Sequence, residues 1–191
     1  MSDSVFNNMK KIILQKLEGL DSRLFYHHIP HTIDVIEQCE RIAIAEGITD
    51  SNEIYLLKVA ALYHDIGFLE TYAGHEIIGC KMFLKDAPEY NFSEEDLTKI
   101  TGMIMATKVP QRPKNILQKI ICDADLDYLG RDDFAEIAGK LKQELFAFKL
   151  IIDEQEWEKI QLIFFRNHNY HTESSRRLRE PVKQINLQSL H

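Results

Sequence analysis

Cysteine, glycine and proline are all scarce in this chain of 191 residues, which has three, eight and five of them. The cysteines, Cys39, Cys80 and Cys122, are odd in number and far apart. That pattern is typical of reduced thiols and argues against a disulfide framework. So few glycines and prolines also argue against a β-rich chain with many tight turns. The sequence therefore favours a helical protein.

Long apolar runs and an excess of positive charge are also missing. No apolar run approaches the ~20 residues of a membrane span, and the first residues, MSDSVFNNMKK, lack the apolar segment of a secretory signal. We therefore expect a cytoplasmic protein that binds no membrane. The 23 basic and 30 acidic residues give a formal net charge of -7, so we expect no extended nucleic-acid partner. A small phosphorylated ligand needs only a few local cations and remains compatible with this charge.

Apolar residues recur with the period of an α-helix along most of the chain, which predicts an all-α fold. The predicted helices cover residues 4–20, 30–46, 50–65, 74–84 and 113–129, with one more after the capping box SEED (93–96), one from Arg131 and a long one through Trp157 and Phe165. The polar tail after Ser174 contains Pro181, so we expect it to be partly helical or frayed. Without repeats or linkers, residues 1–191 are expected to form a single domain.

An adjacent His64 and Asp65 end a strongly apolar helix in the stretch ALYHDIG (61–67). A buried ionised carboxylate is costly unless it is paired or binds a metal. His31 lies on the apolar stripe of another helix, and Asp125 faces inward because its helical neighbours are mostly apolar. Asp123 and its neighbour Asp127 have more mixed neighbours, which indicates a more solvated setting.

Two imidazoles and two carboxylates, from His31, His64, Asp65 and Asp125, suit a divalent ion such as zinc, iron, manganese, nickel or cobalt. Two structural interpretations stay open. The histidines can be hydrogen-bonded core residues, and the acidic run DADLD (123–127) can be a solvated helix face that caps the next loop. From the residues alone, the metal site and these alternatives are evenly matched.

Three stretches, IPHTIDV (29–35), ALYHDIG (61–67) and CDADLDYLG (122–130), resemble the ordered motifs of the HD-domain metal-dependent phosphohydrolase superfamily. The resemblance implies an HD-domain helical bundle with its metal site in a cleft between helices. It covers residues 26–130 and leaves 131–191 as additional C-terminal helices. It also implies that the second aspartate of D-x-D, Asp125, is the metal ligand, with Asp123 as the fallback.

The same resemblance implies that GHEIIG (74–79) belongs to an active-site helix. In bimetallic members a histidine near this position joins a second metal, and the next helix supplies further histidines. Here that helix reads LTKITGMIMATKVP and has none, so we expect one divalent ion (Mn, Fe, Ni, Co, Zn or Mg), with His75 beside it. The missing ligands also argue against a di-iron oxygenase.

The expected function is a phosphohydrolase that cleaves a phosphomonoester or phosphodiester bond of a small molecule, most simply a nucleotide, with a metal-activated water. Asp65 would also accept a proton, His75 would donate to the leaving oxygen or hold a phosphate oxygen, and Lys108 in TKVPQRPK would contact the phosphate. For His75 the alternative is a helix cap, and for Lys108 a solvated charge.

Two other function classes remain open: a non-catalytic nucleotide-sensing or regulatory HD module, and a helical scaffold that forms a homodimer through the aromatic C-terminal helix. His27 and His28, just before the first predicted ligand, are interpreted as entry-loop residues. In NHNYH (167–171), His168 and His171 are interpreted as one packing face with Phe164.

Overall fold

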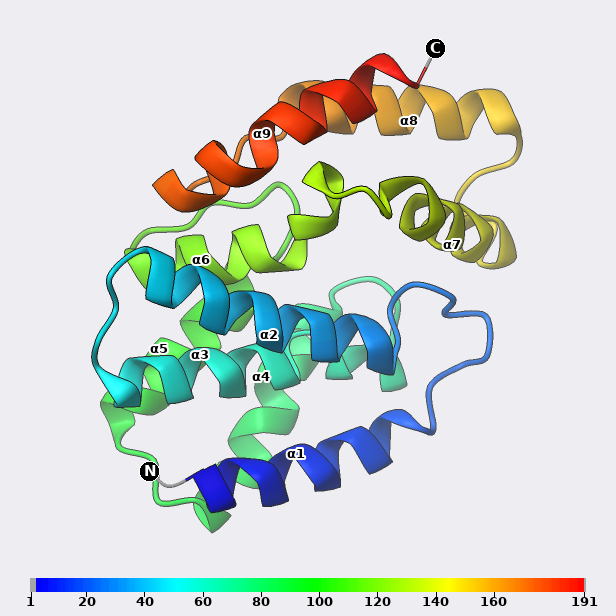
Figure 1. The fold of residues 1–191 in the computed structure, drawn as a ribbon. Coiled ribbons are helices and arrows are strands. Elements are labelled where there is room, and N and C mark those ends of the chain that lie inside the picture. The colour runs from blue at the N-terminus through cyan, green and yellow to red at the C-terminus, as the bar shows by residue number, and fades with distance from the viewer. Residues whose placement is uncertain (1–2, 191) are drawn as a thin grey trace.

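The computed structural model describes residues 3–190, so residues 1, 2 and 191 of the predicted domain lie outside the described part. Within that part every regular element is a helix, which confirms the all-α prediction (Figure 1). The α-helices are α1 (Asp3–Leu17), α2 (Ile29–Ala45), α3 (Ser51–Tyr63), α4 (His75–Asp86), α5 (Glu94–Ala106), α6 (Ile116–Asp125), α7 (Phe134–Ala147), α8 (Glu154–Asn167) and α9 (Glu173–Gln188). Short 3₁₀ turns follow α3, α4 and α6, namely η1 (Ile66–Leu69), η2 (Ala87–Glu89) and η3 (Asp127–Gly130).

The predicted capping box at Ser93 is confirmed. The Ser93 hydroxyl accepts from the Asp96 amide at 3.1 Å, and the Asp96 carboxylate accepts from the Ser93 amide at 3.0 Å. The prediction that Pro113 opens the next helix is wrong by three residues: Asn115 is the cap of α6, and its side chain accepts from the Gln118 amide. An asparagine oxygen can satisfy a free backbone donor there, which proline cannot do.

The tail after Ser174 is not frayed but forms α9, a 16-residue helix that continues through Pro181. Its N-cap is Thr172, whose hydroxyl accepts from the Ser175 amide. Its buried face is polar, with Ser174, Ser175 and Lys183 inside. The buried face of the helix is therefore held mainly by polar contacts, to which Leu187 adds an apolar one.

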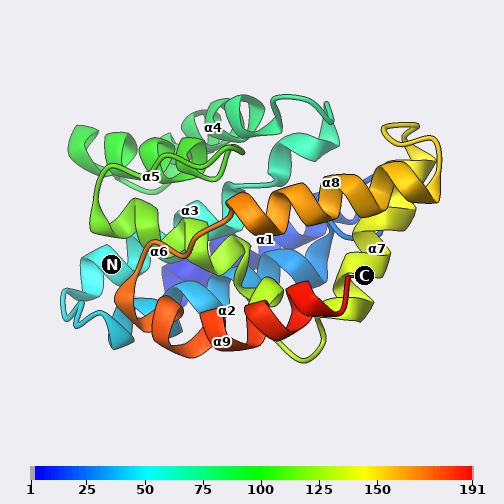
Figure 2. The same cartoon turned by 90° about the horizontal axis from the view of Figure 1, so that it is seen from above.

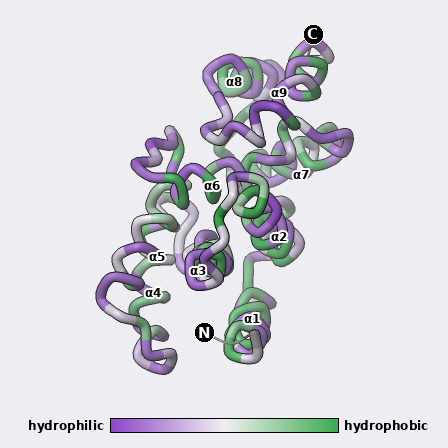
Figure 3. Tube along the Cα trace, turned by 60° about the vertical axis from the view of Figure 1, so that its left-hand side comes forward, coloured by the Kyte–Doolittle hydropathy of each residue, from purple (hydrophilic) through white to green (hydrophobic). Residues whose placement is uncertain are grey.

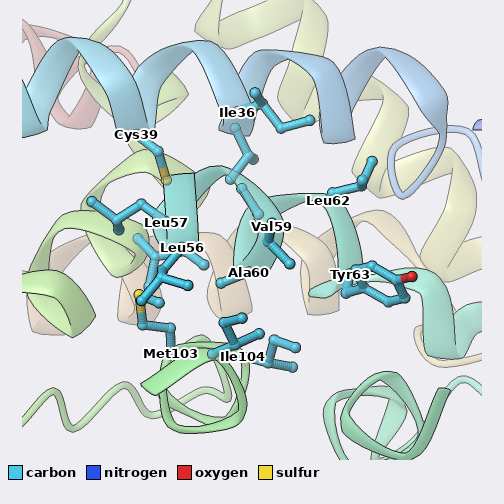
Figure 4. Packing of buried hydrophobic residues seen from close by; sticks show 14 of the residues in the cluster. Ile36, Cys39, Leu56, Leu57, Val59, Ala60, Leu62, Tyr63, Met103 and Ile104 are labelled. Carbon is cyan, nitrogen blue, oxygen red and sulfur yellow. The ribbon is translucent and has the colours of Figure 1, made fainter. Parts of the chain in front are cut away.

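The larger hydrophobic cluster is centred on α3, in which residues from Leu56 to Leu62 are almost all inaccessible to solvent. Figure 4 shows the α3 side chains between Ile36 and Cys39 of α2 on one side and Met103 and Ile104 of α5 on the other. A helix that is apolar all round belongs in the centre of a fold. The residues that follow α3 are consequently delivered deep inside the molecule.

A second hydrophobic cluster joins α7, α8 and η3 with Tyr26, and it includes Phe134, Trp157 and Phe165. Figures 1 and 3 show α8 and α9 at one end of the molecule and α1 at the other, with α2, α3 and α6 between them. In Figure 2, seen from above, α8 and α9 stand apart along most of their length, and other parts of the chain are visible between them. The two clusters thus meet near the ends of α3 and α6.

No described helix meets the length and apolarity that crossing a membrane would require.

Candidate metal centre

The candidate site lies where the ends of three helices meet. His31 is in the first turn of α2, His64 caps the C-terminal end of α3, Asp65 follows it, and Asp125 is the last residue of α6. The chain turns directly after Asp65 into η1, and Gly67 there packs against the start of α4. These helix ends direct four side chains, distant in sequence, to one point.

The predicted four residues are brought together. The Nε2 atom of His31 lies 3.3 Å from Nε2 of His64, 3.4 Å from Oδ2 of Asp65 and 3.2 Å from Oδ1 of Asp125. Nε2 of His64 lies 3.2 Å from Oδ2 of Asp65 and 3.6 Å from Oδ1 of Asp125. Ligands bound ~2.0–2.2 Å from one ion are roughly this far from one another. The ligand atoms of His31, His64 and Asp65 all lie within 4.8 Å of one another, which suits a single metal ion, and Asp125 lies beside both imidazoles.

Two further observations fit a divalent ion at this point. The buried Oδ2 atom of Asp65 has no hydrogen-bond donor among the described residues, although a buried carboxylate oxygen normally has one. Nδ1 of His64 donates to the Ala61 carbonyl oxygen at 2.7 Å, which leaves the Nε2 lone pair directed at the cluster. The donor set fits the metal that the sequence predicts, while the identity of each ligand stays a prediction.

Both carboxyl groups are held in their ionised form. Burial would raise the pKa of Asp65, but the neighbouring His64, His27 and His31 hold it well below its usual range. Burial acts the same way on Asp125, and its close contacts with the rings of His31 and His64 lower its pKa to about 2. Metal binding requires deprotonated carboxylates, so the pair is prepared for a cation.

His75, the first residue of α4, lies beside the cluster on the other oxygen of Asp65. Its Nε2 is 3.5 Å from Oδ1 of Asp65, and its Nδ1 donates to the Tyr72 carbonyl oxygen at 3.0 Å. The ring stacks on Phe68 with 3.9 Å between ring centroids. The imidazole is thus fixed in place, and the backbone N-cap of α4 is Gly74 rather than His75.

The expectation that Asp123 and Asp127 are more solvated is wrong. Asp123 is 0% exposed, and its carboxylate accepts from the His171 amide, the Thr172 amide and the Thr172 hydroxyl. Asp127 is equally buried and pairs with Arg41 and Arg179. All four of these partners lie 48 or more residues away, so local neighbours on α6 could not reveal them.

A cavity of about 500 Å³ opens beside the cluster, between helices as expected. Its polar lining includes Asp65, His75, Glu76, Asp125 and Lys108. The structure therefore brings the three residues predicted to act on substrate, Asp65, His75 and Lys108, to one cavity. Lys108 is exposed on the cavity wall, whereas Arg112 and Lys114 of the same loop are not part of the lining.

Sequence reasoning missed Glu144, a fully buried acid on α7. It accepts from the amides of Tyr26 and His27, from the His27 ring and from the Tyr72 hydroxyl. Burial would lower the pKa of His27, but the hydrogen bond between its ring and Glu144, together with the nearby Asp65, raises that pKa. His27 and Tyr72 both line the cavity, so Glu144 fixes two polar groups there. The sequence does contain one indication that Glu144 is buried: it lies on the same helical face as Leu141 and Phe148, three residues after the one and four before the other.

The family model for the HD domain matches residues 29–127, more than half of the chain. The fold is similar to the crystal structure of a predicted HD superfamily hydrolase from an uncultured Thermotogales bacterium. The TM-score is 0.62 and the identity 21%, over 94% of this chain and 88% of that one. No curated protein matches the chain.

A helical bundle with a His, a His-Asp pair and a distal Asp converging on one point defines a class of metal-dependent hydrolases. The chain belongs to this class, the HD-domain superfamily, which confirms the resemblance of its three motifs.

Proposed function

We propose that the chain hydrolyses a phosphomonoester or phosphodiester bond of a small molecule, with a nucleotide as the first candidate. One divalent ion would be held by His31, His64, Asp65 and Asp125. The observation that carries this proposal is the environment of Asp65. Its Oδ2 faces two imidazoles and has no hydrogen-bond partner among residues 3–190, while its Oδ1 faces His75 at the cavity.

When bound, a divalent ion supplies Lewis acidity, which polarises a phosphoryl oxygen and lowers the pKa of water. Oδ1 of Asp65 faces His75 at the cavity and not the imidazoles of His31 and His64, so it can accept a proton from the attacking water. His75 is fixed through Nδ1–H, and the imidazolium form of its ring would donate from Nε2 to a phosphate oxygen or to the leaving oxygen.

Two more residues are proposed to act on the substrate. Lys108 is a cation on the cavity wall and would contact the phosphate. His27, oriented by Glu144, is a second imidazole able to donate to the leaving oxygen. The cavity volume of about 500 Å³ lies within the usual range for small-molecule sites, which supports a ligand of nucleotide size.

The experiment loads the purified protein separately with Mn, Fe, Co, Ni, Zn or Mg and measures bound metal by mass spectrometry. Each form is then tested on nucleoside mono-, di-, tri- and cyclic phosphates and on simple phosphomonoesters. We expect Asp65→Ala and Asp125→Asn to lose bound metal and to lower turnover by about 10²-fold or more. Asp132→Asn, the same type of change at an exposed position, is the matched control.

Turnover by the metal-loaded protein that is lost in both variants but kept in Asp132→Asn supports the proposal. Metal binding that survives both variants would overturn the ligand set. A protein that binds metal and nucleotide but releases no phosphate from any ester would instead be a sensing module.

A further inference from the structure

The cavity beside the cluster has two unlike walls. The wall described above carries carboxylates and imidazoles. A second part of the lining comes from α7 and α8, and its apolar residues are Leu141, Leu145, Trp157, Ile160, Phe164 and Phe165. Gln161 is the polar side chain that α8 adds to this wall. A ligand whose phosphate lies at the cluster therefore has its remaining atoms against an apolar surface.

The charges around the cavity limit how many phosphoryl groups fit. Among the described lining residues, Lys108 is the single lysine or arginine, while Asp65, Glu76 and Asp125 are acidic. Each further phosphoryl group adds negative charge that must be matched by cations or donors. One divalent ion, one exposed lysine and the imidazoles of His27 and His75, set against three carboxylates, suit a single phosphoryl group better than a di- or triphosphate.

The apolar wall continues beyond the cavity. A neighbouring hollow of about 550 Å³ shares Val109, Leu126, Ile160 and Phe164 with it. Ile160 lines both hollows and is 41% exposed, so its side chain is accessible to a ligand in either of them. An organic group larger than one ring can thus extend along α8.

We propose that the substrate carries one phosphoryl group on an uncharged organic group whose apolar or aromatic face lies on α8, between Ile160 and Phe164. This inference rests on the proposed function, and it names the class of leaving group that the site accepts. It includes nucleoside monophosphates and aryl phosphates, and it excludes nucleoside di- and triphosphates as preferred substrates.

The first test uses binding rather than turnover. Trp157 is the one tryptophan of the chain and lines the cavity, so its fluorescence reports occupation of the wall. The metal-loaded protein is titrated with methylphosphonate and with benzylphosphonate, which share the charged group and resist hydrolysis. We expect benzylphosphonate to bind at least about 10-fold more tightly and to change the fluorescence of Trp157.

Variants of the wall sharpen this test. We expect Ile160→Ala and Phe164→Ala to weaken benzylphosphonate binding by about 10-fold, while methylphosphonate binding stays within about twofold. Ile185→Ala on α9 is the matched control, because Ile185 is 64% exposed and lines neither hollow. Binding of the phosphonates to the variants is followed by calorimetry as well as fluorescence.

The second test compares adenosine mono-, di- and triphosphate, and 1-naphthyl phosphate with glycerol 3-phosphate. We expect kcat/KM to fall at least about 10-fold with each added phosphoryl group, and 1-naphthyl phosphate to exceed glycerol 3-phosphate by a similar factor. Equal binding of the two phosphonates, or a preference for the triphosphate, would overturn the inference. A different result would contradict the proposed function alone: both phosphonates bind with the expected preference, but no ester is hydrolysed.

Discussion

At the scale of single residues, Asp123 and Asp125 lie two positions apart on α6 and have different roles. Asp123 and Asp125 are about 200° apart around the axis of α6. Asp125 therefore faces the imidazoles of His31 and His64, while Asp123 faces the segment before α9. One carboxylate is placed for a metal and the other ties two distant parts of the chain together.

Replacing Asp123 should cost stability and leave the metal site intact. Asp123→Asn puts an amide NH₂ group against the amides of His171 and Thr172, so one or two charge-assisted hydrogen bonds are lost. We expect the free energy of unfolding to fall by about 3 kcal/mol, measured by urea denaturation. Metal content at a temperature where the variant is folded should equal that of the unchanged chain.

We expect the opposite result for Asp125→Asn. This variant should lose metal binding, and its metal-free form should lose less stability than Asp123→Asn does. A variant of Asp123 that keeps full stability but binds no metal would show that the roles of the two aspartates are exchanged.

The inward direction of Asp125 could be predicted from the sequence, because its apolar neighbours one turn away come from the same helix. The burial of Asp123 and Glu144 could not. Their donors, such as Thr172 and His27, lie 49 and 117 residues away, and no local pattern reports such contacts. Long-range hydrogen bonds are therefore the part of the site that sequence reasoning misses.

At the scale of elements, the turn from η1 into α4 positions His75 against Asp65. A Cβ atom added to Gly67 would lie 2.0 Å from the backbone oxygen of His75. A backbone atom cannot rotate away as a side chain does, so the first turn of α4 would have to move. The close approach of these two elements requires glycine at position 67.

Gly67→Ala should therefore displace α4 and weaken the site. We expect a loss of about 3 kcal/mol in the free energy of unfolding, the upper part of the range for overpacked positions, and a clear loss of turnover. Thermal and urea denaturation measure the first and the phosphate-release assay the second.

Gly139→Ala on α7 is the matched control, because an added Cβ atom meets nothing within 4 Å there. It should leave stability unchanged or raise it by up to about 1 kcal/mol. Equal stability of the two variants would contradict the explanation given for Gly67.

Helix α9 is the element that the apolar pattern could not reveal. Lys183 donates to the His168 carbonyl oxygen, Asn186 donates to the Leu129 carbonyl oxygen, and Arg179 pairs with Asp127. Periodicity methods detect apolar stripes, and α9 packs through charged and amide groups. The helices with apolar faces, such as the one leading to His64, could be predicted to within a few residues.

At the scale of the whole molecule, the packing of α8 and α9 makes stability depend on pH. Burial, with Lys183 and His171 nearby, lowers the pKa of His168 from 6.5 to about 3. Between these two pH values the unfolded chain binds a proton at His168 that the folded chain does not. The contribution of His168 therefore favours unfolding increasingly as the pH falls from 6.5 towards 3.

We expect His168→Gln to lose stability less steeply than the unchanged chain as the pH falls from 6 to 4. The difference in slope should approach about 1.4 kcal/mol per pH unit, the value for one proton, and urea denaturation at each pH measures it. Parallel curves for the two proteins would show that His168 titrates normally in the folded state.

The metal side of the molecule could be predicted, because its three motifs span residues 29–130 and the HD-domain model matches all but the last three of these residues. The apolar wall could not be predicted, because Trp157 and Phe164 lie on α8, outside the three motifs, and reach the cavity only through the tertiary fold. The single domain over residues 1–191 and the homodimer stay predictions.

This division of the cavity has a consequence for how such a protein can diversify. The residues placed for the metal and those placed for the leaving group belong to separate stretches of the chain. Substitutions at Ile160, Gln161 and Phe164 can change which organic group fits while His31, His64, Asp65 and Asp125 keep their arrangement. A library randomised at those three α8 positions would thus sample new substrates on a fixed chemistry, and natural drift has the same route open to it.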